Sequence, residues 1–217
     1  MKTIIIRSNG LRYTIKDNKN RFLYPKEFYK IYDKLKTKQK LTALVLINTG
    51  ARIREAQNIK VSDIDLVNKR LVLRVTKSKA KKGESKLTGG RIRVIPISTK
   101  FTKYLKKYIK DNKLDSYQFI GLLTTSPFDM ALKKASQKAG LDDPHNISAH
   151  TLRKTLETWL MALDVDSLKL VAHFGHTVQT AASNYVSPDI FTWEERQDMI
   201  RIIDNLYAPG RGGYRLR

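Results

Sequence analysis

The segment at residues 39–48, QKLTALVLIN, constrains this chain most, because its apolar side chains would cover nearly every side of a helix. A helix without a polar face is stable only when other elements surround it. Gly50 is expected to end this helix. Just upstream, Pro25 opens a second helical pattern. The apolar residues that recur on one face of that pattern are Phe28, Ile31, Tyr32 and Leu35. The chain should therefore fold around a buried helix at 39–48.

The periodicity changes after a short helix expected at about 52–59. The stretch DLVNKRLVLRVTKSK, residues 65–79, alternates between apolar and polar residues, and Asn68 and Lys69 interrupt it as a turn. RIRVIPI at 91–97 alternates again. Alternation of this kind is typical of strands with one buried face. We expect a small antiparallel sheet of two or three strands.

Helical periods return from residue 99 onward. The expected helices lie at about 99–111, 126–139, 148–163, 167–174, 177–186 and 192–206. Residues 1–24 are polar and irregular, with an Asn-Gly turn signal at 9–10, and are interpreted as an N-terminal arm or a short hairpin. The predicted fold class is mainly α with a small antiparallel β-sheet (α+β).

The formal net charge of +22 is the dominant compositional fact. A compact domain with this much self-repulsion is relieved by a polyanion, and nucleic acid is the leading candidate. A membrane surface fits less well, because the basic residues are not gathered on one amphipathic helix. The chain has no cysteine, which removes thiol nucleophiles, disulfides and cysteine metal sites. No apolar run approaches the length of a membrane span.

Two short motifs carry arginines that could bind phosphate. In TGARIREA, residues 49–56, Arg52 begins a helix, where the helix dipole disfavours a cation, and Glu55 could orient its guanidinium. In ISAHTLRKTLETW, residues 147–159, His150 and Arg153 project from one side of the first helical turn. That helix N-terminus is itself a favourable site for an anion. Taken alone, each motif is more often a solvated surface group.

A third stretch, HFGHTVQTAASNYV at 173–186, combines histidine with a lone tyrosine. Gly175 is expected to end the preceding helix, which leaves His176 just past the end and free to point into a cleft. Tyr185 follows nine residues after His176, and by itself would be interpreted as a half-buried packing residue.

The order of these motifs suits the cleavage of a phosphodiester by a tyrosine. Paired guanidiniums neutralise the non-bridging phosphate oxygens and stabilise the charge that grows in the transition state. A histidine accepts the phenolic proton or donates to the phosphate, and a lysine protonates the departing sugar oxygen. This chemistry requires no metal and no cofactor, and the sequence shows no acidic metal cluster near the motifs.

TGARIREA, HTLRKT, HFGH and the trailing Tyr185 together resemble the catalytic domain of the tyrosine recombinase (phage integrase) family, over roughly residues 25–190. Two residues depart from the usual pattern: Phe174, where leucine is more common, and Lys154, where histidine is common. The roles that the resemblance implies follow the motifs. Arg52 and Arg153 would clamp the phosphate, His150 would act in acid–base catalysis, His176 would hydrogen-bond the phosphate or assist the tyrosine, Tyr185 would form the 3′-phosphotyrosyl bond, and Glu55 would play a supporting part.

The family also places a catalytic lysine at the end of the middle strand, which points to Lys77. The neighbouring loop is rich in cations that would contact the DNA backbone. These are Lys79, Lys81, Lys82, Lys86 and Arg91. The alternative is that the loop is only a solvated hairpin tip.

The resemblance divides the chain into an N-terminal arm (1–24), a catalytic domain (25–190) and a C-terminal helix with a basic tail (191–217). The C-terminal helix carries an apolar stripe that would dock either on a neighbouring protomer or on its own domain. The stripe consists of Trp193, Met199, Ile202, Ile203 and Leu206. Family members usually carry a separate DNA-binding domain before the catalytic one, so the chain is either a fragment or a short form.

The implied function is that of a site-specific DNA recombinase that cleaves and rejoins double-stranded DNA without metal or ATP. A homotetramer on two DNA sites is expected, with a monomer or weak oligomer in the absence of DNA. The expected location is the cytoplasm, in association with the nucleoid, or the host cytoplasm for a virus- or plasmid-encoded protein. A relaxing enzyme similar to type IB topoisomerases and a non-catalytic DNA-binding module remain the alternatives.

Overall fold

The structure is a computed structural model that describes residues 3–6, 12–15, 21–74, 92–177, 179, 190–204 and 206–207. Near the N-terminus, strands β1 (Thr3–Ile6) and β2 (Arg12–Ile15) pair antiparallel, so this part of the predicted arm forms a hairpin. Tyr185 and Lys77 lie outside the described residues. The same holds for the expected DNA-contacting residues Lys79, Lys81, Lys82, Lys86 and Arg91.

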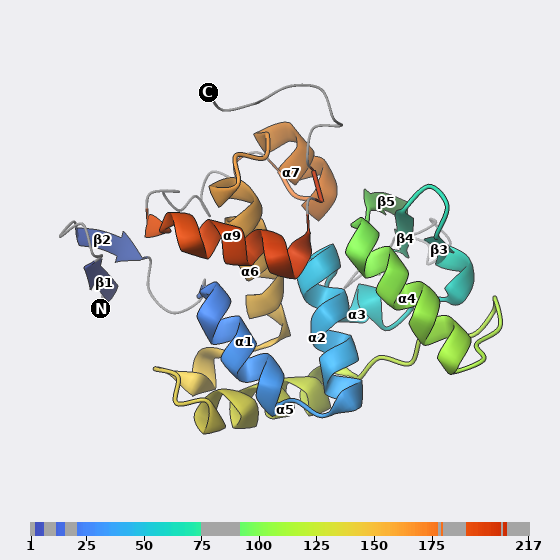
Figure 1. The fold of residues 1–217 in the computed structure, drawn as a ribbon, viewed down its shortest axis with the longest axis horizontal. Coiled ribbons are helices and arrows are strands. Elements are labelled where there is room, and N and C mark those ends of the chain that lie inside the picture. The colour runs from blue at the N-terminus through green and yellow to red at the C-terminus, as the bar shows by residue number, and fades with distance from the viewer. Residues whose placement is uncertain are drawn as a thin grey trace, which may run out of the picture.

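Helices make up most of the described chain (Figure 1). Their bounds are α1 Pro25–Lys34, α2 Thr37–Thr49, α3 Ile53–Ala56, α4 Thr99–Asp111, α5 Thr125–Lys138, α6 Ala149–Ala162, α7 Ser167–Phe174 and α9 Trp193–Ile203. Short 3₁₀ helices span Val61–Asp63 and Pro144–Asn146. The predicted fold class, mainly α with a small antiparallel sheet, is confirmed.

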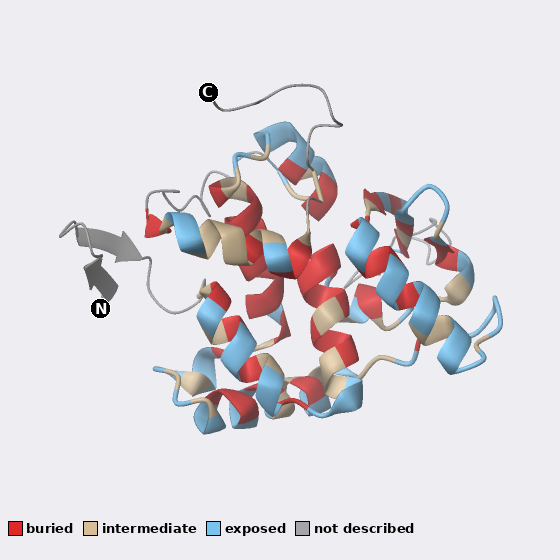
Figure 2. Ribbon diagram, viewed as in Figure 1, coloured by how far each residue is buried: buried red, intermediate tan, exposed pale blue. Residues whose placement is uncertain are grey.

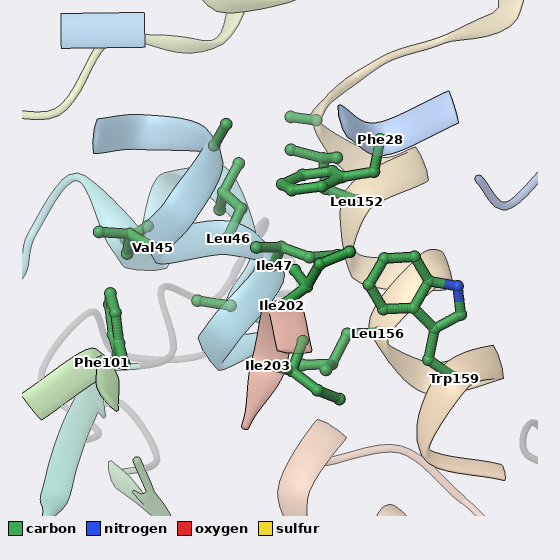
Figure 3. Close-up of a cluster of buried hydrophobic side chains, with 14 of the residues drawn as sticks. Phe28, Val45, Leu46, Ile47, Phe101, Leu152, Leu156, Trp159, Ile202 and Ile203 are labelled. Carbon is green, nitrogen blue, oxygen red and sulfur yellow. The ribbon is translucent and has the colours of Figure 1, made fainter. Parts of the chain in front are cut away.

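Helix α2 lies in the middle of the fold, as its apolar sequence predicts (Figure 2). It packs along α6, and Leu46 and Ile47 are completely buried. Trp159 of α6 closes the core from the other side: its ring meets Phe28 edge-on at 6.1 Å, and its Nε1 donates to the carbonyl of Leu23 at 2.9 Å (Figure 3). This packing fixes the relative position of the segments that carry the arginine motifs.

The second sheet contains β3 (Ile64–Asp65), β4 (Arg70–Arg74) and β5 (Ile92–Pro96), antiparallel and in that order. The turn between β3 and β4 is the predicted one, with Lys69 at a φ of 53°. Leu71, Leu73 and Ile95 point into the core. Arg93 shares the inward parity of Ile95 on β5 and is 8% exposed, which places a cation beneath the sheet.

Helix α9 packs against α1 and α6 of the same chain through Met199, Ile202 and Ile203. Trp193 does not follow the rest of the predicted stripe, because it is 70% exposed. Exchange of this region between protomers stays a prediction. No described helix is long and apolar enough to cross a membrane.

The predicted helix bounds differ from the structure mainly at two ends. The helix expected at 52–59 is only Ile53–Ala56, because the chain turns back after Gln57 and Ile59 pairs with Ile120 beyond it. The last helix ends at Ile203, since Asp204 takes a φ of 56° that a helix cannot continue. The helix expected at 177–186 falls almost entirely outside the described residues.

Candidate active site

The loop after α2 approaches α6 and α7 closely at Gly50. Gly50 adopts a left-handed φ of 58°, and a Cβ at this position would lie 2.4 Å from Cε1 of Phe174 and 3.1 Å from Cδ2 of Leu156. Glycine is therefore required here both for conformation and for space. The close approach brings the Gly50 carbonyl within reach of Arg153 on α6.

Arg153 is clamped by backbone carbonyls. Its Nη1 donates to the oxygen of Gly50 at 2.5 Å and its Nη2 donates to the oxygen of Phe174 at 2.6 Å. The guanidinium also lies 5.1 Å from the centre of the Phe174 ring. Burial, together with the charges of Arg52 and Arg93, lowers the pKa of Arg153 to about 9. The group still carries its charge at neutral pH and is held in one orientation.

Arg52 is held differently, by the carboxylate of Glu55. Oε1 of Glu55 accepts from Nη1 of Arg52 at 2.8 Å, and Oε2 accepts from the Arg52 backbone N–H at 3.0 Å. Glu55 is 1% exposed, whereas the Arg52 side chain is 48% exposed. Because the charge of Arg52 lowers the pKa of Arg153, the two guanidiniums lie within electrostatic range of each other. Together they present two positive groups to one region.

Arg93 on β5 also belongs to this group, although none of the sequence motifs includes it. Its Nη2 donates to Oε2 of Glu55 at 2.8 Å, so Glu55 links two guanidiniums. Nε and Nη1 of Arg93 have no hydrogen-bond partner among the described residues. Burial lowers the pKa of Arg93, and Glu55 opposes this effect. The signal in the sequence was its parity: Arg93 stands on the apolar face of an alternating strand.

His150 lies in the first turn of α6, one turn before Arg153. His150 is exposed to solvent, although the protein around its ring partly desolvates the imidazole. Desolvation lowers the pKa of His150, the charges of Arg153 and Arg52 lower it further, and Glu157 acts in the opposite direction. A neutral imidazole at this position can accept a proton at neutral pH.

His176 follows Gly175, which ends α7 in the predicted left-handed conformation. The expectation that His176 points freely into a cleft was wrong. Its side chain is 10% exposed and stacks on Phe174 with an interplanar angle of 9°. Its Nε2 contacts Oε1 of Glu157 at 3.0 Å. The ring is immobilised because α7 ends directly against α6, a contact that the sequence pattern does not reveal.

A second buried histidine, His173, belongs to the support of the site. Its Nε2–H donates to the carbonyl of Thr49 at 3.0 Å, and its Nδ1 accepts from the hydroxyl of Tyr207 at 2.6 Å. Burial lowers the pKa of His173 to about 3 and raises the pKa of Tyr207 to about 12. Both groups are neutral over the physiological range. They tie the residues after α9 to the end of α2, directly before Gly50.

The described part of the site thus combines three arginines, Arg52, Arg93 and Arg153, with two histidines, His150 on α6 and His176 against it. No group of three or more histidine, aspartate or glutamate residues that could hold a metal ion occurs among the residues described. Guanidiniums held in fixed positions are suited to bind an oxyanion, as they do in phosphoryl-transfer sites.

The chain belongs to the phage integrase family, whose family model matches residues 21–190. Among curated proteins, it is 26% identical to the tyrosine recombinase XerA of Pyrococcus horikoshii over 189 residues, which cover 83% of this chain and 60% of the relative. It is 32% identical to a probable integrase/recombinase of Acholeplasma phage L2, over 65% of this chain and 46% of the relative. The chain spans 43% to 61% of the length of the curated relatives it matches.

Two solved structures share the fold. The crystal structure of XerA recombinase superimposes with a TM-score of 0.59 at 20% identity, over 83% of this chain and 64% of that one. The Tn1549 transposon integrase in complex with transposon right end DNA gives a TM-score of 0.61 at 20% identity, over 89% and 69% of the two chains. At this identity the likeness establishes the architecture and leaves the chemistry to the residues.

Proposed function

We propose that this chain catalyses site-specific recombination of double-stranded DNA through a covalent bond between Tyr185 and a DNA phosphate. The observation that carries the proposal is the pair of guanidiniums, Arg52 at the start of α3 and Arg153 on α6, which are held by separate supports. Membership of the phage integrase family supports it, as do the relatives named as tyrosine recombinases and integrases. The net charge of +22 suits a polyanionic substrate.

In the proposed reaction, the phenolic oxygen of Tyr185 attacks the phosphorus as the bond to the 5′ oxygen breaks. The phenolic proton passes to a base, and the departing 5′ oxygen takes a proton and leaves as a hydroxyl. The product is a 3′-phosphotyrosyl ester, which conserves the energy of the phosphodiester. A 5′ hydroxyl of a partner strand reverses the step and releases the tyrosine, so no external energy source enters the balance.

The described residues divide the work as follows. Arg153 and Arg52 bind the non-bridging oxygens and stabilise the growing negative charge. His150, with its lowered pKa, accepts or donates a proton near the phosphate. His176 acts on the phosphate or on the tyrosine. Lys77, which follows β4 in the sequence, protonates the 5′ oxygen.

The partner and the assembly form the remaining parts of the proposal. Lys79, Lys81, Lys82, Lys86 and Arg91 contact the DNA backbone. Four protomers assemble on two DNA sites, residues 191–217 contribute to their contact, and the protein is a monomer or weak oligomer without DNA. The reaction takes place in the cytoplasm, where the nucleoid or the DNA of a mobile element is the substrate.

The decisive experiment uses nicked suicide duplexes, in which the short 5′-hydroxyl product diffuses away and traps the covalent complex. A pool with random sequence around the nick removes the need to know the target site. The full chain should form an adduct that survives SDS and contains the recovered duplex. Tyr185→Phe should abolish it, because the variant lacks the phenolic oxygen that would form the bond to phosphorus.

Three results would change the assignment. An adduct that persists in Tyr185→Phe shows that another residue is the nucleophile. Relaxation of supercoiled plasmid by the monomer without sequence preference indicates the relaxing enzyme instead of the recombinase. Tight binding with no adduct on any duplex of the pool returns the chain to a non-catalytic DNA-binding module.

A further inference from the structure

Glu157 is a buried acid on the same face of α6 as His150 and Arg153. The three residues follow one another at helical spacing, so their side chains project in one direction. Glu157 is 3% exposed. A buried carboxylate is costly unless it is paired and hydrogen-bonded. Its charge acts to raise the pKa values of His150 and Arg153, so it lies within electrostatic range of both.

The contact between Glu157 and His176 decides which edge of the imidazole is occupied. An ionised carboxylate only accepts hydrogen bonds, so the 3.0 Å contact requires the proton on Nε2 of His176. The opposite nitrogen, Nδ1, is buried and has no hydrogen-bond partner among the described residues. The stacking of the ring on Phe174 restricts its rotation. One nitrogen is therefore engaged, and the other is buried without a hydrogen-bond partner among the described residues.

We infer that Glu157 is a positioning residue for His176, and that the pair acts on the reacting phosphate or on Tyr185 through Nδ1 of His176. The arrangement follows the logic of a carboxylate that fixes the tautomer and orientation of a catalytic histidine. The inference rests on the proposed function, since it names how one residue of that site is held. It assigns a role to Glu157 that the motifs do not include.

The electrostatic surroundings explain why a carboxylate is needed here. The groups that interact electrostatically with His150 and Arg153, which share a face of α6 with Glu157, are mostly cationic. They are Arg52, Arg93, Lys154, Glu55 and Glu157 itself. Without Glu157, the imidazole of His176 would lose the acceptor that fixes its orientation.

Two substitutions separate these effects. Glu157→Gln keeps an oxygen that can accept from Nε2–H but removes the charge. Glu157→Ala removes both the acceptor and the charge. If orientation alone matters, glutamine restores most of the function; if charge matters, it does not. Glu27→Gln is the matched control, because Glu27 forms a partly buried ion pair with Arg21 on α1, away from the site.

The first measurement is independent of catalysis. Nitrogen NMR of histidine-labelled protein follows the protonation of each ring, and His176→Asn identifies the His176 signals by their loss. We expect Nε2 of His176 to carry the proton in the unmodified chain, because it faces the Glu157 carboxylate, and we expect Glu157→Ala to lose this preference for the Nε2–H tautomer. An unchanged tautomer in Glu157→Ala, with the control variant also unchanged, would overturn the pairing.

The second measurement is the rate of adduct formation with a duplex recovered from the random pool. Glu157→Gln should lower the rate about 10-fold and shift the pH-dependent limb of the rate to lower pH, and Glu157→Ala should lower it more. In a His176→Asn background, Glu157→Gln should have almost no further effect, because the two residues act as one unit. A purely structural role would instead give additive losses and an unshifted pH profile.

The two proposals fail in different ways. Absence of an adduct from the unmodified chain on every duplex, or an adduct that survives Tyr185→Phe, overturns the proposed catalysis, while NMR still decides the pairing. An adduct that requires Tyr185 but forms at the unmodified rate in both Glu157 variants overturns the inference alone. A urea unfolding curve for each variant shows whether a lost rate reflects lost folding.

Discussion

The two arginines of the site are held by opposite means. Arg153 is 5% exposed and donates to two backbone carbonyls, which are neutral and fixed by the packing of α2, α6 and α7. Arg52 is half-exposed and donates to Glu55, a buried carboxylate that it shares with Arg93. The Arg153 side chain is therefore part of the core, whereas the Arg52 side chain belongs to an ion network at the edge of the core.

This difference separates stability from catalysis. Buried acceptors that lose their donor destabilise the folded state, whereas an exposed ion pair contributes little to stability. Loss of Arg153 should therefore damage both folding and activity, and loss of Arg52 should damage activity almost alone.

Replacement of Arg153 by alanine should abolish adduct formation and lower the free energy of unfolding by about 3 kcal/mol. The reason is that the carbonyls of Gly50 and Phe174 would be left buried without a donor. Urea unfolding measures the loss. Arg201→Ala, which removes a 73% exposed side chain from α9, is the control and should leave stability within about 0.5 kcal/mol. Equal stability of the Arg153 and Arg201 variants would show that the hydrogen bonds from Arg153 to the two backbone carbonyls do not stabilise the fold.

Arg52→Ala should reduce the rate of adduct formation about 100-fold, the effect of removing one charged stabiliser of the transition state. Its stability should change by less than about 1 kcal/mol, because the lost pair is half-exposed and Arg93 still neutralises Glu55. Arg52→Lys should recover little of the rate, since an ammonium cannot bridge Glu55 and a phosphate as a planar guanidinium does. A strongly destabilised Arg52→Ala would contradict the contrast with Arg153.

Sequence reasoning worked where the pattern is local. The bounds of α4 and α7 were predicted to the residue, and α2 was recognised as buried because its apolar residues surround the helix. The spacing of Arg52 and Glu55 suggested the contact that the structure shows at 2.8 Å. Contacts of this kind follow from helical geometry over one turn.

It failed where partners are far apart in the chain. Arg93 reaches Glu55 across 38 residues, His176 reaches Glu157 across 19, and Tyr207 reaches His173 across 34. None of these pairs lies within one helix or hairpin, so no periodicity encodes it. For Arg93 a partial signal existed in its inward parity on β5; for Glu157, the helical spacing from His150 and Arg153 was visible but lacked a known partner.

Gly50→Ala tests how the core holds Arg153 without touching its side chain. The new Cβ would meet the Phe174 ring at 2.4 Å and force a left-handed alanine, so we expect a loss of about 2 kcal/mol and slower adduct formation as the Gly50 carbonyl shifts. Gly121→Ala is the matched control: its φ is 77°, but nothing lies within 4 Å of the added Cβ. It should lose only about 1 kcal/mol and keep its activity. Equal losses of stability in the two variants would show that the contact with Phe174 adds nothing to the cost of a left-handed alanine.

The smallest expected effect is that of replacing His173, the buried histidine that donates to the carbonyl of Thr49. Its folded pKa of about 3 lies below the ordinary histidine value of 6.5, so below pH 6.5 the unfolded chain takes up a proton that the folded chain excludes. The stabilising contribution is therefore complete above pH 6.5 and is lost progressively as the pH falls toward 3. His173→Gln keeps an amide donor for the Thr49 carbonyl and cannot titrate.

We expect His173→Gln to change stability by about 1 kcal/mol at pH 7, through the imperfect replacement of two hydrogen bonds. Between pH 6.5 and 4, urea unfolding of this variant should show a shallower decline than the unmodified chain, by up to one proton in the linkage slope. His145→Gln, at an exposed position outside the site, should keep the full decline. An identical slope in the His173 and His145 variants would mean that the buried His173 does not cause the decline in the free energy of unfolding at low pH.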